Sequence, residues 1–200
     1  ADIAGRPSWL VASVDELVTP RPNGPLFTLV ADFDRNGWLD VLVTRTCEYT
    51  SPVTDCTTGS PNLLVLQGGD GVRTVLSRPE ETGLEPSLWD QTAVVGDFAD
   101  DPEDPLDDGY PDLIVTRALG GPSRAYRNRG AAAPPRFEAI TGFPSLPSTF
   151  PAQIADYDRD GDLDVVFVKG QMYVGPSLWV NDGGSLVDVT WVHFPIFPLG

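Results

Sequence analysis

Basic residues are scarce in this 200-residue chain, which has 13 Lys and Arg against 29 Asp and Glu and a formal net charge of −16. This scarcity argues against a nucleic-acid partner, because affinity for the phosphate backbone comes from Lys and Arg. It argues equally against an anionic membrane surface. No apolar run approaches the ~18 residues of a membrane-spanning helix, and the sequence does not start like an uncleaved signal peptide. We therefore expect no nucleic-acid partner and no membrane insertion.

Cysteine and histidine are almost absent, and this limits the chemistry available. Cys47 and Cys56 are the only cysteines, and they are too far apart for a CxxC redox or zinc pair. We predict a disulfide that closes a local loop, which would favour an oxidising, extracellular location, with two free thiols as the alternative. His193 is the only histidine, and neither a G-x-S-x-G elbow nor a P-loop occurs. The sequence therefore predicts a protein that is not an enzyme.

Aspartate is the abundant acid, with 22 Asp against 7 Glu, and 15 of the 22 lie in residues 32–40, 97–112 and 156–164. The first and third segments read DFDRNGWLD and DYDRDGDLD. Both fit D-x-D-x-[DN]-G-x-L-D, and we number their nine positions 1 to 9. The middle segment opens at Asp97 and closes at Asp112, with seven more residues than the others. The negative charge is therefore localised in three similar loops.

Carboxylates at this density repel one another unless a cation lies among them. Side-chain oxygens at positions 1, 3 and 5 can face inward, Gly at position 6 allows a sharp turn, and position 7 can offer its carbonyl. Such an oxygen cage suits Ca²⁺ better than Mg²⁺, which requires tighter octahedral geometry. An EF-hand would need flanking helices and Glu at position 12, where this chain has Val43 and Phe167. We therefore expect the Asp at position 9 to complete each site, in loops that join two strands.

The surroundings of the loops repeat as well. The first aspartates of successive loops are 65 and 59 residues apart, and each loop is followed by three apolar segments separated by turns. With the segment before the loop, each unit predicts a four-stranded antiparallel meander, which is the blade of a β-propeller. The fold class is therefore all-β, with three blades. The predicted units are an N-terminal segment 1–25, blades at 26–90 (with the Cys47–Cys56 loop), 91–150 and 151–190, and a tail 191–200.

These repeats resemble the FG-GAP/VCBS type found in integrin α-subunit propellers and many secreted proteins. The resemblance covers residues 26–190, and it implies about three Ca²⁺ sites. Its ligands in the first loop would be Asp32, Asp34, Asn36, Asp40 and the Trp38 carbonyl. In the third loop they would be Asp156, Asp158, Asp160, Asp164 and the Asp162 carbonyl. In the middle loop Asp97, Asp108 and Asp112 align with the pattern, and position 3 stays open among Asp100, Asp101 and Asp107.

Three blades do not obviously close a propeller of about four to eight blades. The segment Trp9–Val14 resembles the last strand of a preceding blade. We therefore expect a longer array, a protein partner, or copies of the same chain that complete a propeller or form a filament.

The predicted function is an extracellular Ca²⁺-binding module with a structural, adhesion or assembly role. The alternatives are a glycan-binding lectin and a non-catalytic appendage of a secreted enzyme. The aromatic side chains at position 7, Trp38 and Tyr110, could stack on a sugar or pack between blades.

Overall fold

The computed structural model describes residues 25–45, 62–69, 71–86, 90–98, 109–117, 123–130, 136–141, 143, 149–169, 176–182 and 185–193. Four predictions lie outside these residues: the Cys47–Cys56 disulfide, the strand Trp9–Val14, the metal ligand Asp108, and the position-3 candidates Asp100, Asp101 and Asp107.

The described strands form three separate antiparallel sheets of four strands each, and every sheet is a simple meander. The first sheet contains β1 (Pro25–Ala31), β2 (Asp40–Arg45), β3 (Leu63–Gln67) and β4 (Arg73–Leu76). The second contains β5 (Asp90–Gly96), β6 (Asp112–Arg117), β7 (Arg124–Asn128) and β8 (Phe137–Ala139). The third contains β9 (Thr149–Ala155), β10 (Asp164–Lys169), β11 (Pro176–Asp182) and β12 (Ser185–Asp188). The expectation of an all-β fold with three four-stranded antiparallel meanders is therefore confirmed, and the described strands do not close a ring.

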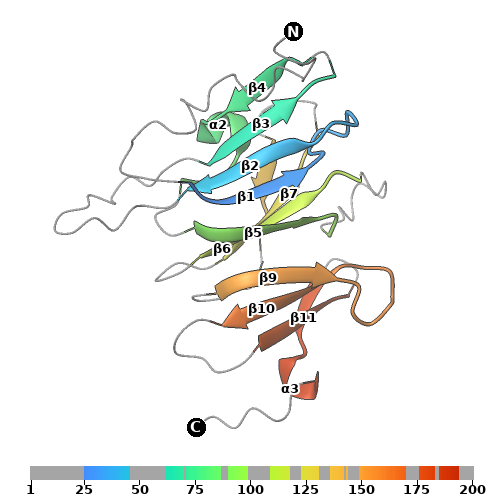
Figure 1. Cartoon of the computed structure of the whole chain (residues 1–200). Coiled ribbons are helices and arrows are strands. Elements are labelled where there is room, and N and C mark those ends of the chain that lie inside the picture. The colour runs from blue at the N-terminus through green and yellow to red at the C-terminus, as the bar shows by residue number, and fades with distance from the viewer. Residues whose placement is uncertain are drawn as a thin grey trace, which may run out of the picture.

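The sheets follow one another through the molecule, with the first near the top of Figure 1 and the third near the bottom. Their first strands lie side by side, β1 next to β5 and β5 next to β9. Each aspartate loop connects the first two strands of its sheet, so loop 1 (residues 32–40) and loop 3 (residues 156–164) lie between β1 and β2 and between β9 and β10. Residues at the same position of the sequence repeat therefore lie at the same place in their respective sheets.

Two apolar clusters hold the three sheets together, and the second sheet contributes to both. All six residues of β6 are buried. Leu113 and Val115 face the first sheet in one cluster, and Ile114 between them faces the third sheet in the other. This is the period-two alternation of a strand covered on both faces. The packing of each sheet against the next therefore stabilises the fold.

Two helices of four residues each follow the last strands of the first and third sheets, and neither was predicted from the sequence. They are α2 (Pro79–Thr82) and α3 (Thr190–His193). In α2, Pro79 occupies the start of the helix and Gly83 ends it at φ 76° in the left-handed region, which favours glycine. No helix among the described residues is long and apolar enough to cross a membrane.

Candidate metal centre

Loop 1 turns sharply through two residues with positive φ, Arg35 at 54° and Gly37 at 87°. A Cβ added to Gly37 would meet no atom within 4 Å, so the backbone angle rather than space favours glycine there. Loop 3 repeats the same turn, with φ 67° at Arg159 and 107° at Gly161. Positions 4 and 6 therefore bend the chain in the same way in both loops.

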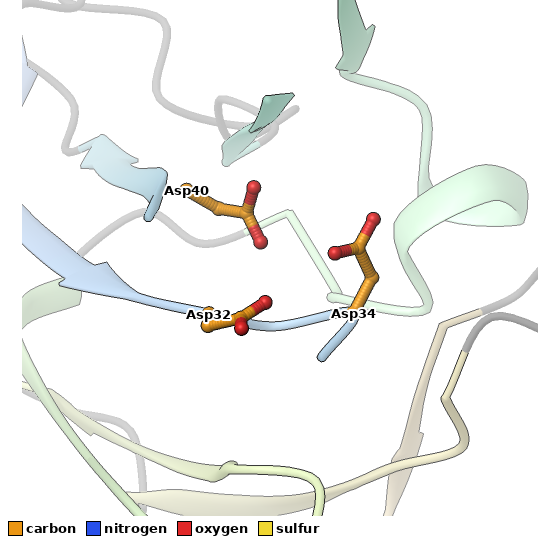
Figure 2. A group of neighbouring side chains, drawn as sticks. All are labelled: Asp32, Asp34 and Asp40. Atoms are coloured by element: carbon orange, nitrogen blue, oxygen red, sulfur yellow. The ribbon is translucent and has the colours of Figure 1, made fainter. Parts of the chain in front are cut away.

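The bend in loop 1 brings together the carboxylates of positions 1, 3 and 9. Ligand oxygens of Asp32, Asp34 and Asp40 lie within 4.8 Å of one another, and the three carboxylates face a common space in Figure 2. In loop 3, the carboxylates of Asp156, Asp158 and Asp164 converge within the same limit. These are two groups that could hold a metal ion, and we call them the first and second aspartate triads.

Hydrogen bonds hold loop 1 in this shape. Asp32 accepts the backbone N–H groups of Asn36 at 3.0 Å and Gly37 at 2.8 Å. The Asn36 side chain accepts the Trp38 N–H at 2.8 Å and donates through Nδ2 to the Gln67 carbonyl, also at 2.8 Å. The last bond ties the loop to the end of β3. Asn36 at position 5 therefore fixes the loop, whether or not its oxygen also binds an ion.

One carboxylate oxygen of the first triad lacks a partner. Asp34 Oδ1 is buried and has no hydrogen-bond partner in the described structure. An unsatisfied buried carboxylate oxygen is costly, and a cation within the triad would remove that cost. The donor set consists of oxygens, as hard cations such as Ca²⁺ require. The residues of loop 1 therefore fit a bound cation.

Loop 3 is more exposed than loop 1. Asp156 and Asp158 are exposed, whereas Asp32 and Asp34 are half-buried. Asp158 accepts the Asp160 N–H at 3.3 Å, and Asp160 accepts the Asp162 N–H at 2.9 Å. Neither Asp160 nor Asp162 is part of the second triad. The same spacing thus gives a similar triad in a more solvated setting.

The aspartate at position 9 has a structural role that is identical in all three sheets. One oxygen of Asp40, Asp112 or Asp164 accepts the N–H of loop position 2, at 2.8, 3.1 and 2.6 Å respectively. The other oxygen accepts the N–H of the last or penultimate polar residue of the third strand (Gln67, Asn128 or Asn181), at 2.7, 2.8 and 2.8 Å. All three aspartates are at most 2% exposed. Sequence reasoning assigned them to metal alone and missed this clamp between loop and sheet.

The electrostatics of Asp40 also favour a cation. Burial raises the pKa of its carboxyl group, and the backbone N–H groups of Gln67 and Phe33 lower it in part. The nearby Asp34 and Asp32 carboxylates raise the pKa further. The ionised triad is therefore unfavourable by itself, and a positive ion would favour its ionised form.

The middle loop is described only at its ends, by residues 97–98 and 109–112. Asp112 makes the position-9 clamp, so the inserted residues of this loop leave that clamp intact. Among the described residues, no third group of acidic side chains converges as the two triads do. Asp97 and Asp112 therefore remain predicted ligands.

The aromatic side chains at position 7 lie on glycines of the same sheet. A Cβ on Gly69 would come within 2.8 Å of the Trp38 ring, and one on Gly130 within 2.8 Å of the Tyr110 ring. The Arg35 guanidinium lies over Tyr110, with Cζ 5.5 Å from the ring centroid. Tyr110 thus packs between two sheets, whereas Trp38 is 46% exposed.

Comparison with known proteins gives one match. Residues 104–167 match the family model of the FG-GAP-like repeat. No curated protein and no solved structure matches the chain. The matched segment runs from the middle loop into β10 and includes the whole of loop 3.

Proposed function

Since the chain carries an FG-GAP-like repeat, we propose that it is an extracellular calcium-binding module of the β-propeller type, with a structural, adhesion or assembly role and no catalytic activity. The observation that carries the proposal is the pair of aspartate triads, each built from positions 1, 3 and 9 of the same loop sequence. Ca²⁺ is the cation that such flexible, oxygen-only sites accept.

The role proposed for the ion is to stabilise the turn between the first two strands of a sheet. Position 9 is already held by backbone N–H groups, and in loop 1 Asp32 is held in the same way. The remaining ligand, Asp34, has the unsatisfied buried oxygen. Calcium would therefore join the preformed part of the loop to the unsatisfied buried oxygen of Asp34, and it would cancel the repulsion among three negative charges.

An extracellular location agrees with the exposure of loop 3. Calcium sites of extracellular modules have dissociation constants of about 10⁻⁴–10⁻³ M, which are sufficient because calcium is abundant outside cells. Exposed carboxylates such as Asp156 and Asp158 are screened by water and salt, so they suit that weak range better than the tight range of a cytosolic buffer.

The experiment is thermal unfolding of the whole chain in Ca²⁺, in Mg²⁺ and in EDTA. We expect Ca²⁺ to raise the melting temperature, Mg²⁺ to raise it less, and EDTA to abolish the increase. The double variant Asp34→Asn with Asp158→Asn changes one ligand in each triad and should lose the calcium response. The control is Asp182→Asn, the same substitution at one exposed residue of β11 outside both triads.

Asp182→Asn should respond to calcium as the unmodified chain does. A melting temperature that is the same in Ca²⁺ and EDTA, together with no bound calcium in isothermal titration calorimetry, would contradict the proposal.

A further inference from the structure

The contact between the first and second sheets is built around loop position 2. Phe33 is fully buried and packs edge-on against Phe137, with ring centroids 5.8 Å apart. The Phe33 carbonyl accepts a hydrogen bond of 2.8 Å from Asn128 Nδ2, from the end of β7. The second and third sheets repeat this contact. Phe98 is 8% exposed, and its carbonyl accepts from Asn181 Nδ2 at 3.4 Å. We call this arrangement the sheet joint.

Two further contacts complete the joint between the first and second sheets. Arg35, at position 4 of loop 1, lies over the Tyr110 ring at position 7 of the next loop. The helix α2, which follows β4, reaches the second sheet, where Arg136 N–H donates to the Glu81 carbonyl at 3.2 Å. In this joint the first sheet contributes a face with loop positions 2 and 4 and a short helix, which we call the forward face. The second sheet contributes a face with Asn128 and the aromatic Tyr110, which we call the rear face.

The third sheet presents a forward face that no described residue covers in this way. Tyr157 holds the position of Phe33 and Phe98 but is 46% exposed. Arg159 holds the position of Arg35 and has the same left-handed backbone. The helix α3 follows β12 as α2 follows β4. On the same face, Val180 pairs with Val187 across β11 and β12, and Val187 is 47% exposed.

The first sheet presents the matching rear face. Gln67 stands where Asn128 and Asn181 stand, and Trp38 stands where Tyr110 stands. Leu39 is 63% exposed, whereas Leu163 at the same loop position packs into the cluster between the second and third sheets. A row of cross-strand neighbours runs over all four strands of this face: Val30, Val41, Val65 and Val75. Val30 is 54% exposed and Val75 is 41% exposed.

We propose that the forward face of the third sheet binds the rear face of the first sheet of a second copy of this chain. The sheet joint would then form a third time. Tyr157 and Arg159 would meet Gln67 and Trp38 of the second copy, with the Arg159 guanidinium over the indole, a cation–π contact for which Trp is the preferred ring.

A second copy is the occupant because the two exposed faces are complementary. The third sheet exposes a forward face, and the first sheet exposes a rear face, and these are the two halves of the sheet joint. The contact is heterologous, and two copies that make it twice close into a ring. Such a ring contains six sheets, within the range of four to eight blades known for propellers. Exposed apolar side chains that gather on one face of a sheet also indicate an interaction surface.

The test uses the full chain and two variants, each with one open face blocked by a charge. Val30→Lys blocks the rear face of the first sheet, and Val187→Lys blocks the forward face of the third. Sedimentation equilibrium over a dilution series should give the unmodified chain twice the 21.5 kDa mass of one copy. Each variant alone should sediment as a single copy. The control Thr141→Lys adds the same charge at an exposed turn of the second sheet and should stay paired.

Mixing the two variants separates this head-to-tail contact from any other. A pair that contains one copy of each variant has one joint with both faces intact, so the equimolar mixture should recover the mass of a pair. Single copies in the unmodified chain at every concentration would overturn the proposal, as would pairs that survive either substitution. A mixture that remains single would exclude the head-to-tail contact, and masses that grow with concentration beyond the pair would overturn the closed ring. Circular dichroism checks that each variant is folded.

Discussion

Loop 1 and loop 3 have the same nine-residue pattern and the same positive-φ turn, yet they differ in their surroundings. The second sheet covers loop 1, where Phe33 is fully buried and Arg35 lies over Tyr110. In loop 3 the equivalent Tyr157 is 46% exposed and contacts His193, with its hydroxyl 3.3 Å from Nδ1. The loop sequence therefore determines the turn and the triad, whereas the neighbouring sheet determines how far the site is shielded from water.

The largest expected difference concerns position 2. Phe33→Ala should lower the free energy of unfolding by about 3–5 kcal/mol, because it removes a fully buried aromatic ring. Tyr157→Ala should lower it by about 1 kcal/mol or less, since its ring is already partly in water. Urea unfolding in the Val30→Lys background, where copies stay apart, measures both. Equal losses would show that loop 3 is covered as loop 1 is.

In loop 3, the aspartate at position 9 should contribute to the free energy of unfolding even without metal. The aspartate at position 3 should contribute only when metal is bound. Asp164→Ala leaves the N–H groups of Tyr157 and Asn181 without their acceptor, so unfolding in EDTA should become easier by about 2–4 kcal/mol. Asp158→Ala should leave the EDTA value nearly unchanged and remove part of the calcium-dependent gain. If Asp164→Ala were also neutral in EDTA, the clamp would not contribute to stability.

The smallest expected difference is in calcium affinity between the loops. Loop 1, measured in Asp158→Asn, should bind Ca²⁺ about tenfold more tightly than loop 3, measured in Asp34→Asn, which corresponds to about 1.4 kcal/mol. The reason is that its half-buried carboxylates are less screened and Asn36 fixes the loop to β3. Calorimetry at two salt concentrations checks this, because added salt should weaken loop 3 more. The reverse order of affinities would show that the extra charges of Asp160 and Asp162 outweigh burial.

Much of the fold could be predicted from the sequence, because the signal repeats. The aspartate loops and the apolar segments after them predicted three four-stranded antiparallel meanders, which the described strands form. The helices α2 and α3 could not be predicted in this way, because four residues are too few to show helical periodicity.

The candidate site was predictable only in part. Alternation of Asp with other residues indicates which side chains can converge, so the side chains at positions 1, 3, 5 and 9 were expected to lie together. The structure brings together the carboxylates of positions 1, 3 and 9. The clamp of position 9 could not be predicted. Its carboxylate oxygens accept hydrogen bonds from backbone N–H groups, and every residue except proline has such a group, so no residue type marks the partner. The bond from Asn128 to the Phe33 carbonyl joins residues 95 apart in different sheets, and no local pattern specifies such a contact.

The most direct measurement is a crystal structure of the whole chain grown in calcium, with anomalous diffraction data to locate the ion. We predict one calcium peak among the carboxylates of Asp32, Asp34 and Asp40, and a second among those of Asp156, Asp158 and Asp164. Water or side-chain donors in both triads, with no anomalous peak in saturating calcium, would contradict the proposal that these loops bind calcium.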